Sequence, residues 1–172
     1  MPVEVLTLDR MDRIGGHPVT VLGAPRLASG PHGPAVEFDG CADGLQLPVN
    51  PLAGLSSFTV EALFRPDPGG LPEQRFLHMG TTHGDRTLLE TRLTAAGHWF
   101  LDTYIHAAAA EGTLLNQGFL HPLGRWYHLA LAFDGTDQAN YVDGRLERRS
   151  ALPYVPAGSG RTSIGVRLNR VC

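Results

Sequence analysis

The sequence contains no lysine, and all of its 14 basic residues are arginine. With 17 acidic residues the formal net charge is -3, and no stretch of the chain concentrates positive charge. Nucleic-acid binding needs clustered positive charge against the phosphates, so we expect no nucleic-acid partner. Long apolar runs are also missing, since none approaches the roughly 20 residues that a membrane-spanning helix needs. We therefore expect no membrane partner.

Cysteine is scarce, with Cys41 and Cys172 the two in the chain. Two isolated cysteines supply neither a disulfide framework nor the ligand set of a structural zinc site. We expect two free thiols, while a bridge, which would need Cα atoms within about 7 Å, stays open. The start of the chain, Met1–Glu4, shows neither the basic nor the apolar region of a secretory signal. By default this predicts a cytoplasmic location.

Glycine and proline are plentiful, with 21 and 13 residues, which indicates many turns. Apolar residues make up 42% and charged residues 18%, as in an ordinary folded domain rather than a disordered chain. No repeat, linker or low-complexity segment divides the 172 residues. The length suits one hydrophobic core, so we expect a single domain over residues 1–172.

Short apolar–polar alternations recur along the whole chain, and no amphipathic pattern is long enough for a stable helix. The clearest runs are Phe58–Phe64, with Phe58 on its apolar face, and residues 125–133. Further runs lie at residues 3–8, 18–22, 34–38, 45–47, 75–79, 86–93, 98–107, 113–115, 139–142, 145–149 and 161–166. Asp-Gly pairs at 39–40, 134–135 and 143–144 favour turns, because glycine adopts positive φ at little cost. This pattern predicts an all-β fold, a sandwich of two antiparallel sheets.

Three segments carry a shared pattern: AVEFDG at 35–40, SFTVEALFRP at 57–66, and WYHLALAFDG at 126–135, followed by YVDG and SIG. In this order and spacing they resemble the laminin-G-like members of the concanavalin A-like lectin and glucanase jelly-roll family. The resemblance implies two stacked antiparallel sheets, one of them with a gently concave face. It also implies a strand after Ile164-Gly165, yet the chain stops at Cys172. We therefore expect either a missing final strand or an open sheet edge, which would favour a homodimer or another partner.

Alternate positions of several strands combine charged and aromatic side chains on one face. Carboxylates, guanidinium groups and aromatic rings are what a hydroxyl-rich ligand requires. We expect a ligand groove on a sheet face, lined by Glu61, Arg65, Glu90, Arg92, Tyr104, His106 and His128. The alternative is an ordinary solvated sheet face with cross-strand ion pairs.

Asp39 and Asp43 flank a glycine-containing turn, and carboxylates of this kind suit a hard cation. The family resemblance implies a calcium ion in some relatives, so Ca2+ at these residues is an expectation. The alternative is that Asp39 is only the turn residue, because calcium takes six to eight oxygen ligands. The eight histidines show no spacing typical of a metal site, and we expect structural or surface roles for them.

Glucanases of this jelly-roll family place an E-x-D-x-x-E run on one strand. Here Glu37 and Asp39 are followed by Gly40-Cys41-Ala42, so the run is absent. Glu61 and Glu90 could form an acid and base pair if they lay on neighbouring strands. No nucleophile elbow, P-loop or dinucleotide motif is present.

The sequence therefore predicts a non-catalytic binding module with a glycan as its ligand. This expectation rests partly on family analogy, since one fold hosts many functions. A protein-interaction or assembly domain is the first alternative. A glycoside hydrolase or lyase with an atypical site is the second.

Overall fold

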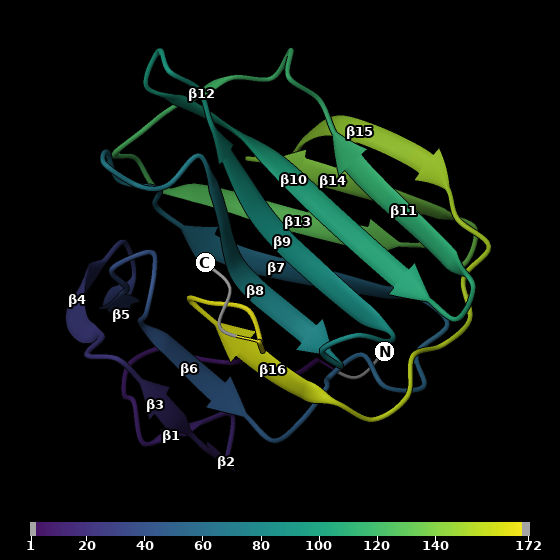
Figure 1. The fold of residues 1–172 in the computed structure, drawn as a ribbon, viewed down its shortest axis with the longest axis horizontal. Helices are drawn as coiled ribbons and strands as arrows, with labels where there is room; N and C mark the ends of the chain where they lie inside the picture. The colour runs from purple at the N-terminus through teal and green to yellow at the C-terminus, as the bar shows by residue number, and fades with distance from the viewer. Residues whose placement is uncertain (1–2, 170–172) are drawn as a thin grey trace.

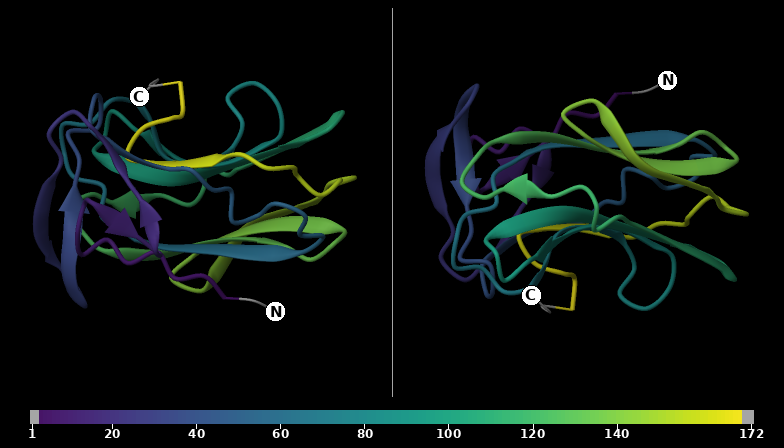
Figure 2. Two further views of the ribbon diagram at one scale, coloured as in Figure 1. Left: turned by 90° about the horizontal axis from the view of Figure 1, so that it is seen from below. Right: turned by 90° about the horizontal axis from the view of Figure 1, so that it is seen from above.

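The computed structural model describes residues 3–169, which form an all-β sandwich of two antiparallel sheets (Figure 1). Figure 2 shows the two sheets as stacked layers, seen from two sides. The large sheet contains β3 (Thr20–Leu22), β6 (Gly44–Leu47), β8 (Glu73–Gly80), β9 (Arg86–Leu93), β10 (His98–Ala107), β11 (Ala110–Leu115), β12 (His121–Pro122) and β16 (Arg161–Ile164). Its order is β11-β10-β9-β8-β16-β6-β3, with β12 also paired to β10.

The small sheet contains β7 (Phe58–Phe64), β13 (Tyr127–Phe133), β14 (Asp137–Val142) and β15 (Arg145–Ala151), in the order β15-β14-β13-β7. Two hairpins stand apart from both sheets: β1 (Arg13–Ile14) with β2 (His17–Pro18), and β4 (Arg26–Gly30) with β5 (Gly33–Glu37). Among the described residues no helix is long and apolar enough to cross a membrane.

Side chains from both sheets fill the space between them, with the parity that the sequence predicts. Leu89 and Ile105 of the large sheet pack in one cluster with Leu131 and Phe133 of the small sheet. Trp99 of β10 lies in a second cluster, packed edge-on against Tyr127. Each strand of the sandwich therefore leaves its other parity free to face outward.

The strand expectations hold best in the middle of the chain. β7, β9 and β10 have the predicted bounds. The run at residues 3–8 is not a strand: its Leu6 and Leu8 pack against the cluster around Ile14 without pairing to a neighbour. Alternation records which side chains are buried, and it does not guarantee a hydrogen-bonded partner strand. The strand β4 was not predicted.

The Asp-Gly turns form as expected. Asp143 and Gly144 join β14 to β15 with φ of 48° and 76°, as a type I′ hairpin requires. Gly80 ends β8 with φ of 118°, and a Cβ there would lie 2.3 Å from the carbonyl oxygen of Asp85. Glycine thus allows the close return of the chain from β8 into β9.

The run at 161–166 does not itself form an edge of the large sheet in the described part of the chain. β16 lies inside the large sheet, hydrogen-bonded to β8 on one side and to β6 on the other. The outer strands of the large sheet are instead β3 and β11. Homodimer formation stays a prediction, without this strand as its basis. The expected free thiol of Cys172 lies outside the described residues, as do residues 1–2 and 170–171.

Candidate functional site

The outer face of the large sheet carries a row of charged residues across three neighbouring strands. The register places Glu90 of β9 opposite both Arg75 of β8 and Asp102 of β10. In the adjoining row Arg92 lies opposite Glu73. Because the core takes the other parity of β9 and β10, all of these side chains project from the outer face.

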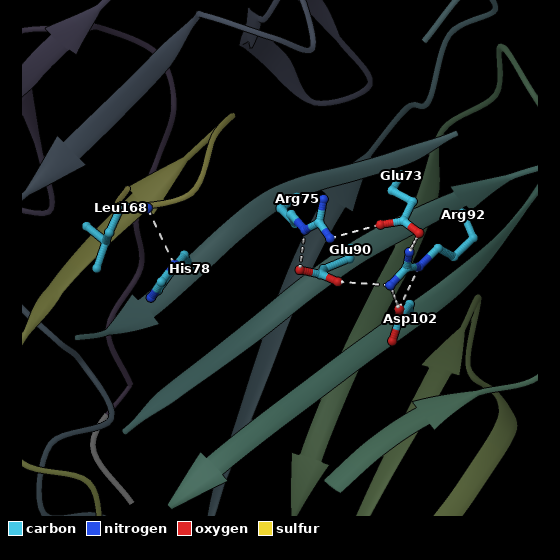
Figure 3. A network of polar contacts seen from close by, with 7 residues as sticks. All are labelled: Glu73, Arg75, His78, Glu90, Arg92, Asp102 and Leu168. Carbon is cyan, nitrogen blue, oxygen red and sulfur yellow. Dashed lines mark hydrogen bonds and ion pairs between the residues drawn. The ribbon is translucent and has the colours of Figure 1, made fainter. Parts of the chain in front are cut away.

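These side chains form one connected ion-pair lattice (Figure 3). The Nε of Arg75 donates to Oε1 of Glu90 at 3.1 Å, and its Nη2 donates to Glu73 at 2.9 Å. Arg92 donates to Oδ2 of Asp102 through Nε at 2.7 Å, and it also pairs with Glu73. The Nη2 of Arg92 lies 3.5 Å from Oε2 of Glu90. Four members, Glu73, Arg75, Glu90 and Arg92, therefore each contact at least two others. Asp102 is held by two nitrogen atoms of the Arg92 guanidinium.

Two carboxylates of the lattice are buried although they lie on an outer face. The side chains of Glu90 and Asp102 are 7% and 3% exposed. Burial raises the pKa of both carboxyl groups, and the neighbouring arginines act in the opposite direction. The Oδ1 atom of Asp102 is buried and has no hydrogen-bond partner among the described residues. This acceptor is therefore orphaned, and it lies beneath the solvent-accessible surface of the face.

An aromatic group adjoins the lattice toward the turn between β8 and β9. The hydroxyl of Tyr104 donates to Oε2 of Glu111 at 2.6 Å. The guanidinium of Arg86 lies 5.0 Å from the centre of the Tyr104 ring and donates to its hydroxyl at 3.3 Å. His106 follows on the same face, with its Nδ1 3.8 Å from Asp85. Burial, followed by the bond to Glu111, raises the pKa of Tyr104, so it is a protonated donor at neutral pH.

The segment after β16 lies on the same side of the large sheet as this face, against β8. Figure 2 shows the last described residues and the loop between β8 and β9 rising on the same side of the large sheet. The N–H of Leu168 donates to Nδ1 of His78, a buried residue on the outer parity of β8 (Figure 3). The tail and the loop therefore lie together at one end of the area that holds the lattice and Tyr104.

The predicted groove residues divide between two opposite faces. Glu90, Arg92, Tyr104 and His106 lie together on the outer face of the large sheet. Glu61 and His128 belong to the small sheet, because β7 pairs with β13 and not with β9, and Arg65 directly follows β7. The expectation of a single groove lined by all of these residues is wrong, and so is the pairing of Glu61 with Glu90 on neighbouring strands.

The residues on the small sheet make local contacts. His128 Nε2 lies 3.0 Å from Oε2 of Glu61, and both side chains are well exposed. Arg65 pairs with Asp67 at 2.9 Å and lies over the ring of Trp126. Exposed pairs of this kind are screened by solvent and contribute little. A ligand role for Glu61, Arg65 and His128 stays a prediction.

The expected calcium residues bind the backbone of their own turn. Oδ1 of Asp39 accepts the N–H groups of Cys41, Ala42 and Asp43, each at 2.9 Å. Asp43 accepts N–H groups with both oxygens, from Ala24 at 2.7 Å and from Asp39 at 3.1 Å. Oxygen atoms that already accept N–H groups are poorly placed to coordinate a cation, and no described group of His, Cys, Asp or Glu has the arrangement of a metal site. Three of the four carboxylate oxygens are thus engaged by the backbone, and Ca2+ at Asp39 and Asp43 stays a prediction.

Sequence reasoning missed three members of the lattice: Glu73, Arg75 and Asp102. Asp102 shares the parity of Tyr104 and His106, so its position beside the acidic and basic positions of β9 was a usable signal. Glu73 and Arg75 gave no such signal, because the register of β8 shifts between Arg75 and Leu77. This irregularity changes which side chains face outward.

The arrangement offers fixed acceptors and donors side by side on a sheet surface. Carboxylates of Glu73, Glu90 and Asp102 accept hydrogen bonds, and the guanidinium groups of Arg75 and Arg92 orient them. Adjacent hydroxyl groups of a sugar can bind such paired acceptors and donors simultaneously. The ring of Tyr104 adds an aromatic surface.

Comparison with solved structures shows the same architecture in several carbohydrate-related proteins. Domain 4 of an extracellular arabinanase from Geobacillus stearothermophilus, solved in complex with arabinotriose, has a TM-score of 0.66 at 16% identity, covering 89% of this chain and 76% of that one. A carbohydrate-binding module from Bacillus subtilis has a TM-score of 0.51 at 17% identity, covering 85% and 86%. The binding domain of botulinum neurotoxin DC, solved in complex with SialylT, has a TM-score of 0.58 at 11% identity, covering 93% and 42%. At these identities the likeness shows the fold alone.

A comparison with curated proteins finds no match. The sequence profile of the concanavalin A-like lectin/glucanases superfamily, in its laminin-G form, matches residues 39–170. That range is most of the chain, and it contains every strand of the sandwich except β3. The all-β fold with two antiparallel sheets agrees with it. The chain therefore belongs to the concanavalin A-like lectin/glucanase superfamily.

Proposed function

We propose that this protein is a non-catalytic module that binds a carbohydrate on the outer face of its large sheet. The observation that carries the proposal is the ion-pair lattice around Glu90 and Asp102, in which the buried Oδ1 of Asp102 has no partner among the described residues. Side chains that are already fixed lose little conformational entropy when a ligand binds. This small cost favours the binding of a sugar, whose individual contacts are weak.

A purely structural lattice is the competing explanation. Burying a carboxylate costs free energy that an ion pair does not always return. The raised pKa of Glu90 and of Asp102 shows that burial outweighs the stabilising arginines at both positions. Groups held in this way are more frequent at binding and catalytic sites than elsewhere. The arabinotriose complex of the arabinanase domain and the Bacillus subtilis module support a glycan as the ligand class by analogy of fold.

Glycan-array screening followed by titration calorimetry tests the proposal. The chain offers a matched pair of variants: Glu90→Gln in the lattice, and Glu61→Gln on the opposite sheet with the same change of charge. Loss of a hydrogen bond to a charged group lowers affinity by about tenfold or more. We expect that loss for Glu90→Gln and unchanged affinity for Glu61→Gln.

A folding defect in Glu90→Gln would confuse this result, so Tyr104→Phe serves as a second variant. It removes one hydroxyl from a half-buried side chain and leaves the lattice in place. Circular dichroism would verify the fold of each variant. Failure of the wild-type chain to bind any glycan, or equal losses in Glu61→Gln and Glu90→Gln, would refute the proposal.

Glycoside hydrolysis is a second candidate, favoured by one observation. Glu90 and Asp102 lie directly opposite each other on neighbouring strands, and the pKa of each carboxyl group is raised by burial. Two such carboxyl groups on one face can act as acid and base. Release of reducing ends from a polysaccharide, abolished by Glu90→Gln, would favour hydrolysis over binding alone.

A further inference from the structure

Arg167 is a half-buried cation that the lattice does not use. It lies in the segment after β16, which rises on the outer side of the large sheet beside β8. Its Nε atom is buried and has no hydrogen-bond partner among the described residues. None of the ion pairs formed by the described carboxylates involves Arg167, whereas Arg75 and Arg92 each pair with at least two acidic groups.

A second arginine faces the same area from the sheet below. Arg86 stacks on Tyr104, and its terminal nitrogens donate to Tyr104 and to the carbonyl oxygen of Gly84. Its Nε is also buried without a hydrogen-bond partner, and no described carboxylate forms an ion pair with Arg86. These contacts fix the direction of the Arg86 side chain, and Tyr104 links it to Glu111 without a direct ion pair.

The strand register extends this positive end of the face. Arg161 of β16 and Arg86 of β9 both pair with Gly80, from opposite sides. Because glycine has no side chain, nothing from β8 stands between the two arginine positions. His106 lies opposite Arg86 and continues the row onto β10. The row ends at Glu111 of β11, which lies opposite His106. The end of the face near Gly80 therefore carries the two arginines, and the acidic groups Glu111 and Asp85 lie beside His106.

The electrostatic surroundings of Arg167 contain charges of both signs. Burial lowers the pKa of Arg167, and Arg75 and Arg86 lower it further by repulsion, while Glu90 and Tyr104 act in the opposite direction. Arg167 thus has two like charges and the attracting carboxylate of Glu90 nearby, but it forms no ion pair with a described carboxylate. A ligand anion would remove that repulsion and would satisfy donors that now have none.

We propose that Arg167 and Arg86 bind an anionic group of the saccharide, so that the ligand is an acidic glycan bearing carboxylate or sulfate groups. This inference rests on the proposed carbohydrate function and adds the class and the orientation of the ligand. The anion lies at the end of the face near Arg86 and Gly80, and the sugar hydroxyls lie over the lattice of Glu90 and Asp102. Arginine suits this role because its planar fork donates two parallel hydrogen bonds to one anion.

The test compares glycans that differ in charge alone. Oligogalacturonides and their methyl esters supply the carboxylate arm, and a sulfated galactan and its desulfated form supply the sulfate arm. We expect the wild-type chain to bind at least one charged glycan about tenfold more tightly than its neutral counterpart. The preferred arm identifies which anion the site accepts. Added salt should weaken the charged complex more than the neutral one.

Arg167→Gln should abolish this preference for charge and leave affinity for the neutral counterpart unchanged. The matched control is Arg148→Gln on β15, an exposed arginine of the other sheet that forms no ion pair with the described carboxylates. It removes the same charge from the chain, so an equal effect in both variants would indicate a general field and overturn the proposal. Arg167→Lys keeps the charge but loses the fork, and an intermediate affinity is expected.

The outcomes separate the two proposals. Binding to neutral glycans without any preference for their charged forms overturns the acidic-ligand inference and leaves the carbohydrate function standing. A charge preference that survives in Arg167→Gln, with the fold intact by circular dichroism, also overturns it. Absence of binding to every charged and neutral glycan overturns both proposals together.

Discussion

His78 holds Leu168 against the large sheet, with its Nδ1 accepting the Leu168 N–H at 3.4 Å (Figure 3). An N–H can only donate, so Nδ1 is the unprotonated nitrogen and Nε2 donates to the carbonyl oxygen of Thr81 at 3.0 Å. One neutral ring thus joins the tail after β16 to the loop after β8. These two segments lie at one end of the proposed ligand face, so the charge of His78 bears on the shape of that face.

Acid should weaken the fold through His78. The ring is 1% exposed, and its pKa is lowered from 6.5 to about 4. Burial is the main cause and repulsion from Arg167, Arg86 and Arg161 adds to it, while the bond to Thr81 acts in the opposite direction. Between pH 6.5 and 4 the unfolded chain binds a proton that the folded chain refuses, so stability is complete above pH 6.5 and falls as the pH drops. Integrated over that window, the loss is about 3 kcal/mol.

Urea unfolding at pH 7 and near pH 4.5 measures this loss. His78→Gln keeps a neutral polar side chain without the titration, so its stability should depend less steeply on pH over the same window. Identical pH dependence in His78→Gln and in the wild-type chain would show that His78 does not titrate as described.

Asp39 should stabilise its turn mainly as a hydrogen-bond acceptor. It accepts three backbone N–H groups, and these bonds lower the pKa of its carboxyl group. Asp39→Ala should cost about 1–2 kcal/mol in the free energy of unfolding. The electrostatic part is present above the ordinary pKa of 3.8 and disappears as the pH falls through the lower folded value. Asp39→Asn retains an acceptor oxygen, so it should lose less than Asp39→Ala at pH 7.

Calcium should have no effect on stability, because the oxygens of Asp39 and Asp43 that face the turn already accept N–H groups. A ligand that binds only the folded state raises the melting temperature by mass action. Thermal unfolding in millimolar CaCl2 and in EDTA should therefore give the same midpoint. A rise of several degrees with calcium, lost in Asp39→Asn, would instead confirm the expected metal site.

Much of the sandwich follows from local sequence, because the parity of a strand depends on which of its own side chains are apolar. The core positions of Phe58, Leu131 and Phe133 were predictable in this way. The order of strands was not, since it depends on pairing between distant segments. For that reason Glu61 and Glu90 were assigned to one surface, although they lie on opposite faces.

The site residues that the sequence did not predict were missed for specific structural reasons. Continuing the alternation back from Leu77 and Met79 would place Arg75 in the core, but the register shift after Arg75 moves it to the outer face. Arg167 lies beyond the last strand, where no periodic pattern indicates what the chain covers. Its position depends on contacts of the tail with His78, which no local signal encodes.

The contact between His121 and Glu147 should be a strong link between the two sheets. His121 Nε2 lies 2.6 Å from Oε1 of Glu147, whose side chain is buried, and the strands belong to different sheets. Burial raises the pKa of Glu147, and His121 opposes that rise. His121→Ala should therefore cost about 3 kcal/mol, because it leaves a buried carboxylate without its partner.

Glu147→Gln is the control for this link. It removes the charge while keeping an oxygen near His121, so it should destabilise the fold less than His121→Ala does. Guanidinium unfolding of the single variants and of the double variant gives the coupling energy. A coupling near zero would show that the contact does not join the sheets energetically.

Two buried threonines should respond in opposite ways to the same substitution. The hydroxyl of Thr103 lies in the core at 0% exposure and has no hydrogen-bond partner among the described residues. The hydroxyl of Thr162 is equally buried but donates to the carbonyl oxygen of Val49 at 2.8 Å. Valine has nearly the shape of threonine, so each substitution isolates the hydroxyl. We expect Thr103→Val to stabilise the fold by about 1 kcal/mol, since it removes an unsatisfied polar group, and Thr162→Val to destabilise it by about 1–2 kcal/mol. Chemical unfolding of both variants under one condition measures the difference, and a loss of stability in Thr103→Val would mean that its hydroxyl bonds a buried water.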